Sequence, residues 1–295
     1  MEYLPQLLIN TLIISCIYAL FATSFWIIYS TTKYFNFAHG AIFTWGAYIT
    51  YLFNKHWGIP IIISIAMSAT LCALLGYFME KGIFHSLRQR SGSTTNIQLI
   101  ASLGIYIVLQ NAVSLIFGDD TKSLHSGIIE TGKLLGNVRI TPNQIIIIVI
   151  SVVMVIAIGV YLKLSRTGKA IRAISNDINL AQISGVDSEK TFTRIYVICS
   201  ALAAIGGTLV ALDTDITPSM GMNALLISVV VLIIGGLSNF FGIFLGAISL
   251  GVAQNLGVWA FSSQWQNTIA FLILLIFLFF RPQGFLGRKI KKATI

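Results

Sequence analysis

Residues 165–187, SRTGKAIRAISNDINLAQISGVD, form a short basic stretch between two long apolar runs of the chain. On a helix of about 3.6 residues per turn, one face of this stretch is apolar and carries Ile171, Ile174, Ile178 and Ala181. The opposite face is polar and carries Lys169, Arg172, Asn176 and Asn179. An amphipathic segment of this kind lies along a membrane surface. The apolar runs on either side of it are therefore predicted to cross the membrane.

The composition of the whole chain agrees with a membrane setting. Of its 295 residues, 56% are hydrophobic and 10% are charged, and the mean hydropathy is +0.85. A span needs about 20 mainly apolar residues, and in lipid such a run forms a helix because the backbone must satisfy its own hydrogen bonds. We therefore predict an all-α polytopic membrane protein, a single domain over residues 1–295, with about nine spans and a range of about eight to ten. They cover residues 6–29, 34–54, 59–79, 97–117, 143–163, 191–212, 222–238, 241–260 and 266–281.

The second, seventh and eighth of these spans contain residues that interrupt a regular apolar helix. Asn36 and His39 lie in the second span, and glycines recur in all three. Each of the three is a candidate for a broken or re-entrant segment, which would change the count. Small residues also let helix backbones approach closely. We assign that packing role to Gly40, Gly46, Gly235, Gly236, Gly242 and Gly246.

The distribution of Lys and Arg predicts the orientation in the membrane. With the C-terminus in the cytoplasm and the N-terminus outside, all but four of the nineteen Lys and Arg residues fall on the cytoplasmic side, as the positive-inside rule requires. The four exceptions are Lys55, Lys122, Lys133 and Arg139. The net charge of +9 thus reflects membrane topology, and we expect no nucleic-acid partner, because the basic residues sit at span ends.

The longest loop on the predicted outer side covers residues 118–141. Gly127, Gly132 and Gly136 separate short alternating pieces there, a pattern typical of a small hairpin or cap. Such a cap offers a surface to a soluble partner.

No motif for chemistry stands out along the chain. It has no HExxH, no GxSxG and no paired carboxylates within a predicted span, and Ala170 follows Gly168 and Lys169, so there is no Walker A sequence. His39 has no Cys, Asp or Glu close by in the sequence that would complete a metal site. We expect a protein that is not an enzyme, with no catalytic residues, metal site or cofactor of its own.

One polar group is predicted at membrane depth. Asn36 and His39 are three residues apart, and Tyr48 follows in the same span. If the segment is helical, Asn36 and His39 share a face, and polar side chains in lipid must find partners. Two alternatives remain open at this stage. The group lines a pathway for a polar solute, or it forms hydrogen bonds between helices that fix their packing.

Five pieces of the sequence together resemble a known family. They are YALFATSFWIIYSTTKYFNFAHGAIFTWGAY at 18–48, LGIYIVLQ at 103–110 with FGDD at 117–120, the surface stretch at 165–187, VVLIIGGLSNFFGIFLGAISLG at 230–251, and FRPQGFLG at 280–287. The chain resembles the membrane permeases of ABC importers of the branched-chain amino acid (leucine/isoleucine/valine) type. It departs from them at residues 85–88, where HSLR stands in place of the usual Pro-Leu-Arg pattern.

The resemblance implies that residues 165–187 form a cytoplasmic coupling segment that docks into a groove of an ATP-binding subunit. We expect a rigid helix of about 16 residues, about 24 Å long. Its coupling residues would be Gly168, Lys169, Arg172, Ala173, Asp177, Ala181 and Gly185. The alternative is an ordinary interfacial helix anchored on anionic lipid.

The resemblance also implies an assembly in the bacterial inner (cytoplasmic) membrane. Its parts would be a second permease, homologous or identical, two cytoplasmic ATPases that bind ATP and Mg, and an extracytoplasmic solute-binding protein that meets loop 118–141 and the acidic turn at 213–218. The chain would be one permease subunit and form half of the pathway for branched-chain or related amino acids. Alternatives are the same role for urea or short amides, or an ion-coupled secondary transporter, which would need acids within the spans.

Overall fold

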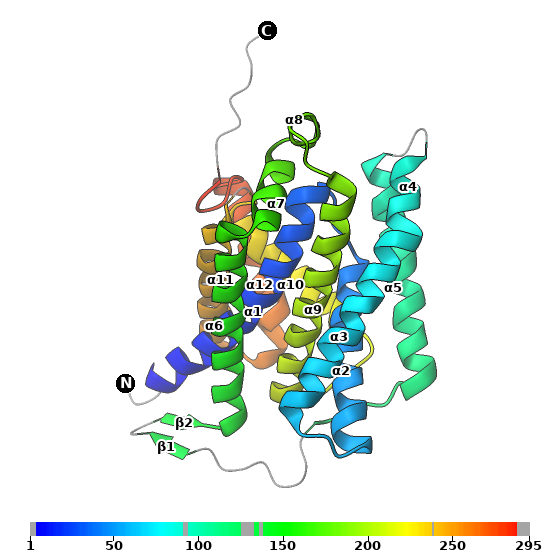
Figure 1. Cartoon of the computed structure of the whole chain (residues 1–295). Coiled ribbons are helices and arrows are strands. Elements are labelled where there is room, and N and C mark those ends of the chain that lie inside the picture. The colour runs from blue at the N-terminus through cyan, green and yellow to red at the C-terminus, as the bar shows by residue number, and fades with distance from the viewer. Residues whose placement is uncertain (1–3, 91–93, 125–132, 136–137, 238, 288–295) are drawn as a thin grey trace.

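A computed structural model describes residues 4–90, 94–124, 133–135, 138–237 and 239–287, and these are almost entirely helical (Figure 1). The α-helices are α1 (Leu4–Thr32), α2 (Ala38–Tyr51), α3 (Ile61–Met79), α4 (His85–Gln89), α5 (Thr95–Phe117), α6 (Pro142–Leu164), α7 (Arg166–Asn176), α8 (Ile178–Ile183), α9 (Ser188–Asp213), α10 (Met220–Gly235), α11 (Phe240–Ala260) and α12 (Gln266–Phe280). Short π-helices at Leu52–His56 and Glu80–Phe84 extend α2 and join α3 to α4, and a 3₁₀ turn at Ser263–Trp265 precedes α12.

Seven helical stretches in the described chain are long and apolar enough to cross a membrane. They correspond to the first, third, fourth, fifth, sixth, eighth and ninth predicted spans. The second and seventh are the shorter helices α2, with 14 residues, and α10, with 16 residues. At about 1.5 Å per residue α10 covers about 24 Å and does not cross about 30 Å of hydrocarbon by itself. α2 reaches about that length only through the π-helix Leu52–His56, which carries the polar residues Asn54, Lys55 and His56. Among the described residues, seven full spans are thus found and not nine.

Local backbone geometry explains why α2 begins late and where α10 ends. Lys33 has a φ of +61°, so α1 ends there and residues 33–37 form an irregular connection before α2. Gly236, with a φ of +99°, ends α10. The eighth span, by contrast, is the unbroken helix α11, although Gly242 and Gly246 lie inside it. Those two glycines pack against α10 and do not interrupt the helix.

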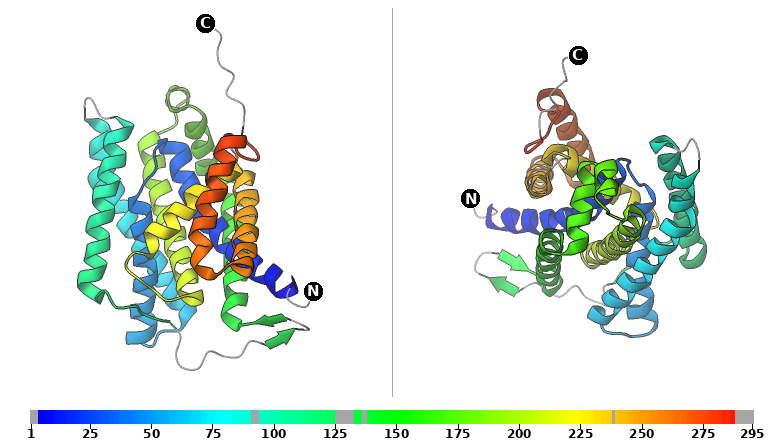
Figure 2. Two further views of the ribbon diagram at one scale, coloured as in Figure 1. Left: turned by 180° about the vertical axis from the view of Figure 1, so that it is seen from behind. Right: turned by 45° about the horizontal axis from the view of Figure 1, so that its top comes forward.

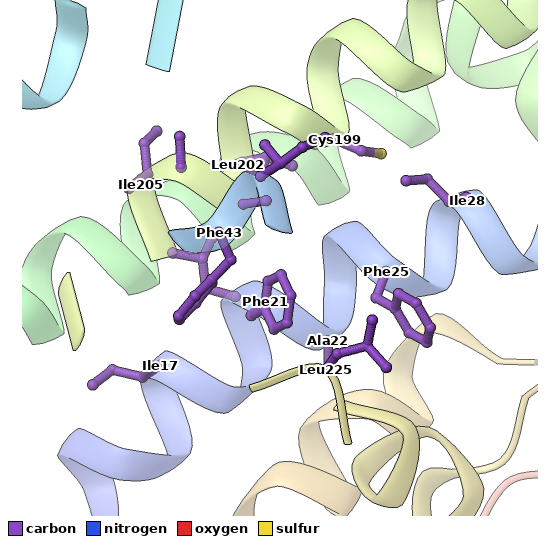
Figure 3. Close-up of a cluster of buried hydrophobic side chains, with 14 of the residues drawn as sticks. Ile17, Phe21, Ala22, Phe25, Ile28, Phe43, Cys199, Leu202, Ile205 and Leu225 are labelled. Carbon is purple, nitrogen blue, oxygen red and sulfur yellow. The ribbon is translucent and has the colours of Figure 1, made fainter. Parts of the chain in front are cut away.

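α1 and α9 form the centre of the bundle. The most apolar windows of these two helices are 72% and 78% buried, whereas those of α5 and α12 are 17% and 6% buried. Figure 3 shows part of this core, where the Phe21 ring of α1 lies 4.5 Å from the Phe43 ring of α2 and Phe25 of α1 lies near Leu225. α5 and α12 therefore lie at the periphery of the isolated chain (Figure 2).

The bundle has two distinct ends, which we call the α7 end and the hairpin end (Figure 1). At the α7 end, Lys33 Nζ donates to the Ser175 carbonyl at 2.7 Å, and Arg88 pairs with Glu189. At the hairpin end, the Arg139 amide donates to Gln6 Oε1 at 2.9 Å. Lys33 and Arg88, which the sequence analysis assigned to the cytoplasmic side, thus lie at the α7 end, and Arg139, which it assigned to the outer side, lies at the hairpin end.

The predicted hairpin is confirmed at the end of loop 118–141. β1 (Lys133–Leu135) pairs with β2 (Val138–Ile140) as an antiparallel ribbon. Gly127, Gly132 and Gly136, which predicted it, lie outside the described residues.

Candidate functional site

The amphipathic stretch consists of two helices, α7 with 11 residues and α8 with 6. The expectation of one rigid helix of about 16 residues is wrong, because the chain breaks at Asp177. That residue has an extended backbone, and its Oδ1 accepts from the amides of Asn179, at 2.8 Å, and Leu180, at 3.1 Å. An Asp side chain that caps a new helix competes with continuation of the old one. The result is a bent segment held at the tip of the bundle (Figure 1).

The inner face of this segment follows the helical periodicity of the sequence. Ile171, Ile174 and Ala181 are only 3%, 1% and 4% exposed. α7 packs against α1, α6 and α9, and α8 packs against α7 and α9. The segment is thus fixed to the central helices of the bundle and is not a loose surface helix.

The seven residues assigned to coupling divide between two environments. Lys169, Arg172, Asp177 and Gly185 are exposed, Ala173 is half-buried, and Gly168 and Ala181 are buried. A Cβ at Gly168 would collide with the carbonyl oxygens of Tyr161 and Leu162 in the last turn of α6. Gly185 has open space around it but a φ of +83°, so there the backbone conformation at the end of α8 requires glycine. Gly168, Ala181 and Gly185 therefore have structural roles in the packing and the turn of the segment.

Sequence reasoning missed two apolar residues on α8 that face outward. Leu180 and Ile183 are 63% and 83% exposed, at the tip of the bundle. They are three residues apart and so share a face of α8. Their spacing was visible in the sequence, but only the break at Asp177 reveals that α8 turns this pair away from the core.

Charged groups tie the segment to its surroundings. Arg172 donates to the Leu162 carbonyl at the end of α6. Burial lowers the pKa of Lys33, which donates to the Ser175 carbonyl. Asp187 caps α9, and the backbone N–H that Lys190 donates to it lowers the pKa of this carboxyl. The two capping acids, Asp177 and Asp187, thus mark the start of α8 and of α9.

A buried ion pair connects α4 and the π-helix that precedes it to α9. Arg88 donates to both carboxylate oxygens of Glu80, which is fully buried, and its Nη2 also lies 3.1 Å from Glu189 Oε2. The guanidinium stacks 4.4 Å from the centre of the Phe192 ring. Glu189 lies in the first turn of α9, directly after α8. This triad was not predicted, although its arginine lies in the departure from the family pattern at residues 85–88.

The polar group predicted at membrane depth lies between helices and is buried. Asn36 precedes α2, so it does not share a helical face with His39, and its Nδ2 donates to Tyr196 Oη at 3.0 Å. Tyr196 also bonds the Tyr34 hydroxyl at 2.8 Å. His39 Nε2 lies 2.9 Å from Ser24 Oγ.

Each member of this group also keeps a buried polar atom without a hydrogen-bond partner among the described residues. These atoms are Asn36 Oδ1, His39 Nδ1 and Tyr48 Oη. Hydrogen bonds between helices thus use Asn36 Nδ2 and His39 Nε2 and leave Asn36 Oδ1 and His39 Nδ1 unsatisfied. A role in the pathway stays a prediction.

The glycines assigned to packing lie where backbones meet. A Cβ at Gly40 would come 2.8 Å from the Gly221 carbonyl oxygen, and one at Gly46 would collide with Ala204. Gly235 and Gly242 face each other's carbonyls, and Gly246 faces the Val231 carbonyl. Gly236 approaches the backbone of residues 283–287, where the Phe285 amide donates to the Ile234 carbonyl at 2.8 Å. Two of the motifs that carry the family resemblance therefore pack on each other.

A bundle of long apolar helices with close glycine contacts and a structured surface segment defines the class of polytopic helical membrane proteins. Residues 7–278 match the family described as the permease component of the branched-chain amino acid transport system. The chain belongs to this family, which confirms the resemblance.

Similar proteins extend the comparison. The chain is 30% identical to the high-affinity branched-chain amino acid transport system permease protein BraD of Pseudomonas aeruginosa, over 97% of this chain and 96% of that one. It is 26% identical to LivH of Escherichia coli, a permease protein of the same description, with the same coverage. Among solved structures, PsaBC from Streptococcus pneumoniae in complex with Fab has a TM-score of 0.51 at 14% identity, covering 94% of this chain and 92% of that one. This last likeness concerns the fold alone.

Proposed function

We propose that this chain is a permease subunit of an ATP-driven importer in the bacterial inner membrane and forms half of a pathway for branched-chain or related amino acids. The observation that carries the proposal is the family match over residues 7–278. The second half of the pathway would come from a second permease, homologous or identical. An extracytoplasmic binding protein would deliver the solute.

The α7 end is the proposed docking site for the ATPase subunits, which supply the bound ATP and Mg. α8 presents Leu180 and Ile183 outward, and the preceding helix α7 exposes Lys169 and Arg172. Exposed apolar side chains ringed by polar groups are typical of a protein interface. The Arg88 triad offers a rigid route from this end to α3, because it joins the first turn of α9 to buried Glu80.

The hairpin end is the proposed surface for the binding protein. Residues 118–124 of the loop and the turn at 213–218 lie side by side there, because Lys122 and Ile216 exchange backbone hydrogen bonds of 3.0 and 2.7 Å. Both segments were proposed from the sequence for this contact. Their juxtaposition makes one continuous surface out of two separate stretches.

Asn36, His39 and Tyr48 remain the proposed pathway residues. Support comes from the unpartnered polar atom that each carries among the described residues. A passing amino acid or its water could satisfy these atoms once α2 moves against its neighbours, since buried polar groups without partners are costly.

Reconstitution tests the proposal. The chain would be co-expressed with the ATPase, second permease and binding protein encoded beside its gene, and incorporated into proteoliposomes. We expect ATP hydrolysis and uptake of radiolabelled leucine, both dependent on the binding protein. If only urea or acetamide stimulated ATP hydrolysis, the substrate would be a urea-like amide and the importer mechanism would stand. Failure of any ATPase to co-purify would overturn the importer assignment.

A further inference from the structure

A large groove lies between α1, α6 and α11 and ends against α7. Its volume is about 1030 Å³, and its walls are mostly apolar, with Leu12, Val155, Ile156, Phe244, Ile248 and Val252 among them. Several of these side chains are exposed in the isolated chain, including Ile156 at 60% and Ile248 at 52%. No proposed pathway residue lines the groove. It faces the surroundings of the bundle and requires an apolar occupant.

The groove is apolar along its length and basic at one end only. Lys163 at the end of α6 and Arg172 on α7 line the α7 end, together with Ser175 and Asn176. Lys33 reaches the same place, where its Nζ donates to the Ser175 carbonyl. No carboxylate is among the described residues that line the groove. An occupant with an anionic head and apolar tails matches this arrangement.

The length of the α6 and α11 walls agrees with such an occupant. On α6 the groove runs from Ser151 to Lys163, and on α11 from its cap Asn239 to Val252, which at 1.5 Å per residue is about 18 to 20 Å. On α1 it runs from Leu8 to Ser30, about 33 Å, so only the walls on α6 and α11 have the length of one leaflet. One leaflet of a bilayer is about 15 Å thick, half of about 30 Å of hydrocarbon. Basic pockets between membrane helices are known to hold anionic lipid head groups.

We propose that the groove binds an anionic phospholipid of the leaflet at the α7 end, with its phosphate on Lys163 and Arg172 and its acyl chains between α6 and α11. Gly159 of α6 lines the groove opposite Phe240, whose ring lies 3.4 Å from where a Cβ would stand, so a large side chain at 159 would occupy the groove. The lipid would fill the space between α6 and α11 beside the central helix α1, below α7. It would thereby support the base of the α7–α8 segment.

Native mass spectrometry of the purified full chain tests this proposal. The chain in detergent is titrated with phosphatidylglycerol or phosphatidylcholine of identical acyl chains. We expect one phosphatidylglycerol to bind more tightly than phosphatidylcholine. Lys163→Gln should weaken phosphatidylglycerol binding about fivefold, the effect of one basic residue near an anionic head, and leave phosphatidylcholine unchanged. Gly159→Leu, which fills the groove, should weaken both.

Arg166→Gln is the matched control, since Arg166 is an exposed basic residue of α7 that does not line the groove. It should leave binding of both lipids unchanged. Equal binding of the two lipids, an equal effect of Arg166→Gln and Lys163→Gln, or full binding by Gly159→Leu would each overturn the proposal. A dimer that Gly159→Leu dissociates would instead assign the groove to a second copy of the chain. None of these readouts depends on transport.

Discussion

At the scale of single residues, the bundle depends on glycines at which two backbones meet. Gly46 lies against Ala204, which places α2 in direct contact with α9. The sequence identified Gly46 as a packing residue because small residues recur in the apolar spans. It did not identify the partner, since that requires knowing which face of α9 turns toward α2. The same holds for Asn36 and His39, whose partners Tyr196 and Ser24 are distant in sequence.

Substitution of Gly46 tests this close approach. Gly46→Ala should lower the free energy of unfolding by about 1–3 kcal/mol, because the new methyl group overlaps the Ala204 backbone. Gly104→Ala is the control, since Gly104 lies within α5 and a Cβ there meets open space. It should be neutral or stabilising by up to about 1 kcal/mol through helix propensity. Thermal unfolding of the two variants in detergent measures the difference, and equal melting temperatures would refute the packing role.

At the scale of elements, the bend between α7 and α8 and the triad of Arg88 decide how the α7 end is built. Periodicity predicted the buried face of residues 165–187, because Ile171 and Ile174 repeat at helical spacing. The break at Asp177 was not predicted, although an Asp at a helix start is a known capping signal. The triad was beyond sequence reasoning, because Arg88 reaches Glu189 across 101 positions of the chain.

Removal of the cation from this triad should be costly. Arg88→Met leaves the Glu80 carboxylate buried without its partner, and we expect a loss of about 3 kcal/mol of stability. The double variant Glu80→Gln with Arg88→Met removes both charges and should recover most of that loss. Melting temperatures of the wild type, both single variants and the double variant form a mutant cycle. Additive effects of the two substitutions would show that the pair does not interact.

The outward pair on α8 belongs to the same scale and tests the docking proposal. Ile183→Ser removes an apolar side chain that is 83% exposed, so the melting temperature of the isolated chain should not change. We expect leucine-dependent ATP hydrolysis of the reconstituted importer to fall at least tenfold, because an apolar contact at the centre of an interface is lost. Leu164→Ser, at a position 70% exposed on α6, is the matched control. Full activity of Ile183→Ser would remove α8 from the docking site.

At the scale of the whole molecule, charge bias predicted two groups of residues on opposite sides of a membrane, and the fold separates them at two ends. Lys33, Arg88 and Arg172 contact other residues at the α7 end, whereas Lys122 and Arg139 do so at the hairpin end. The count of spans was predicted less well, because α2 begins only after the turn at Lys33 and α10 ends at Gly236, and neither is among the long apolar helices of the described residues. Hydropathy measures only composition, and these two boundaries come from backbone conformation.

Labelling of single cysteines tests which end faces the cytoplasm. Asp120→Cys at the hairpin end and Ile183→Cys at the α7 end replace side chains that are 92% and 83% exposed. The native Cys72 and Cys199 are fully buried, and Cys16 lies within the span of α1, so the wild type reports the background. Since positive charge is retained in the cytoplasm, a membrane-impermeant maleimide should label Asp120→Cys in intact spheroplasts and Ile183→Cys only in inverted vesicles. The reverse pattern would place α8 outside the cell, where no cytoplasmic ATPase can reach it. It would refute both the predicted orientation and the docking proposal.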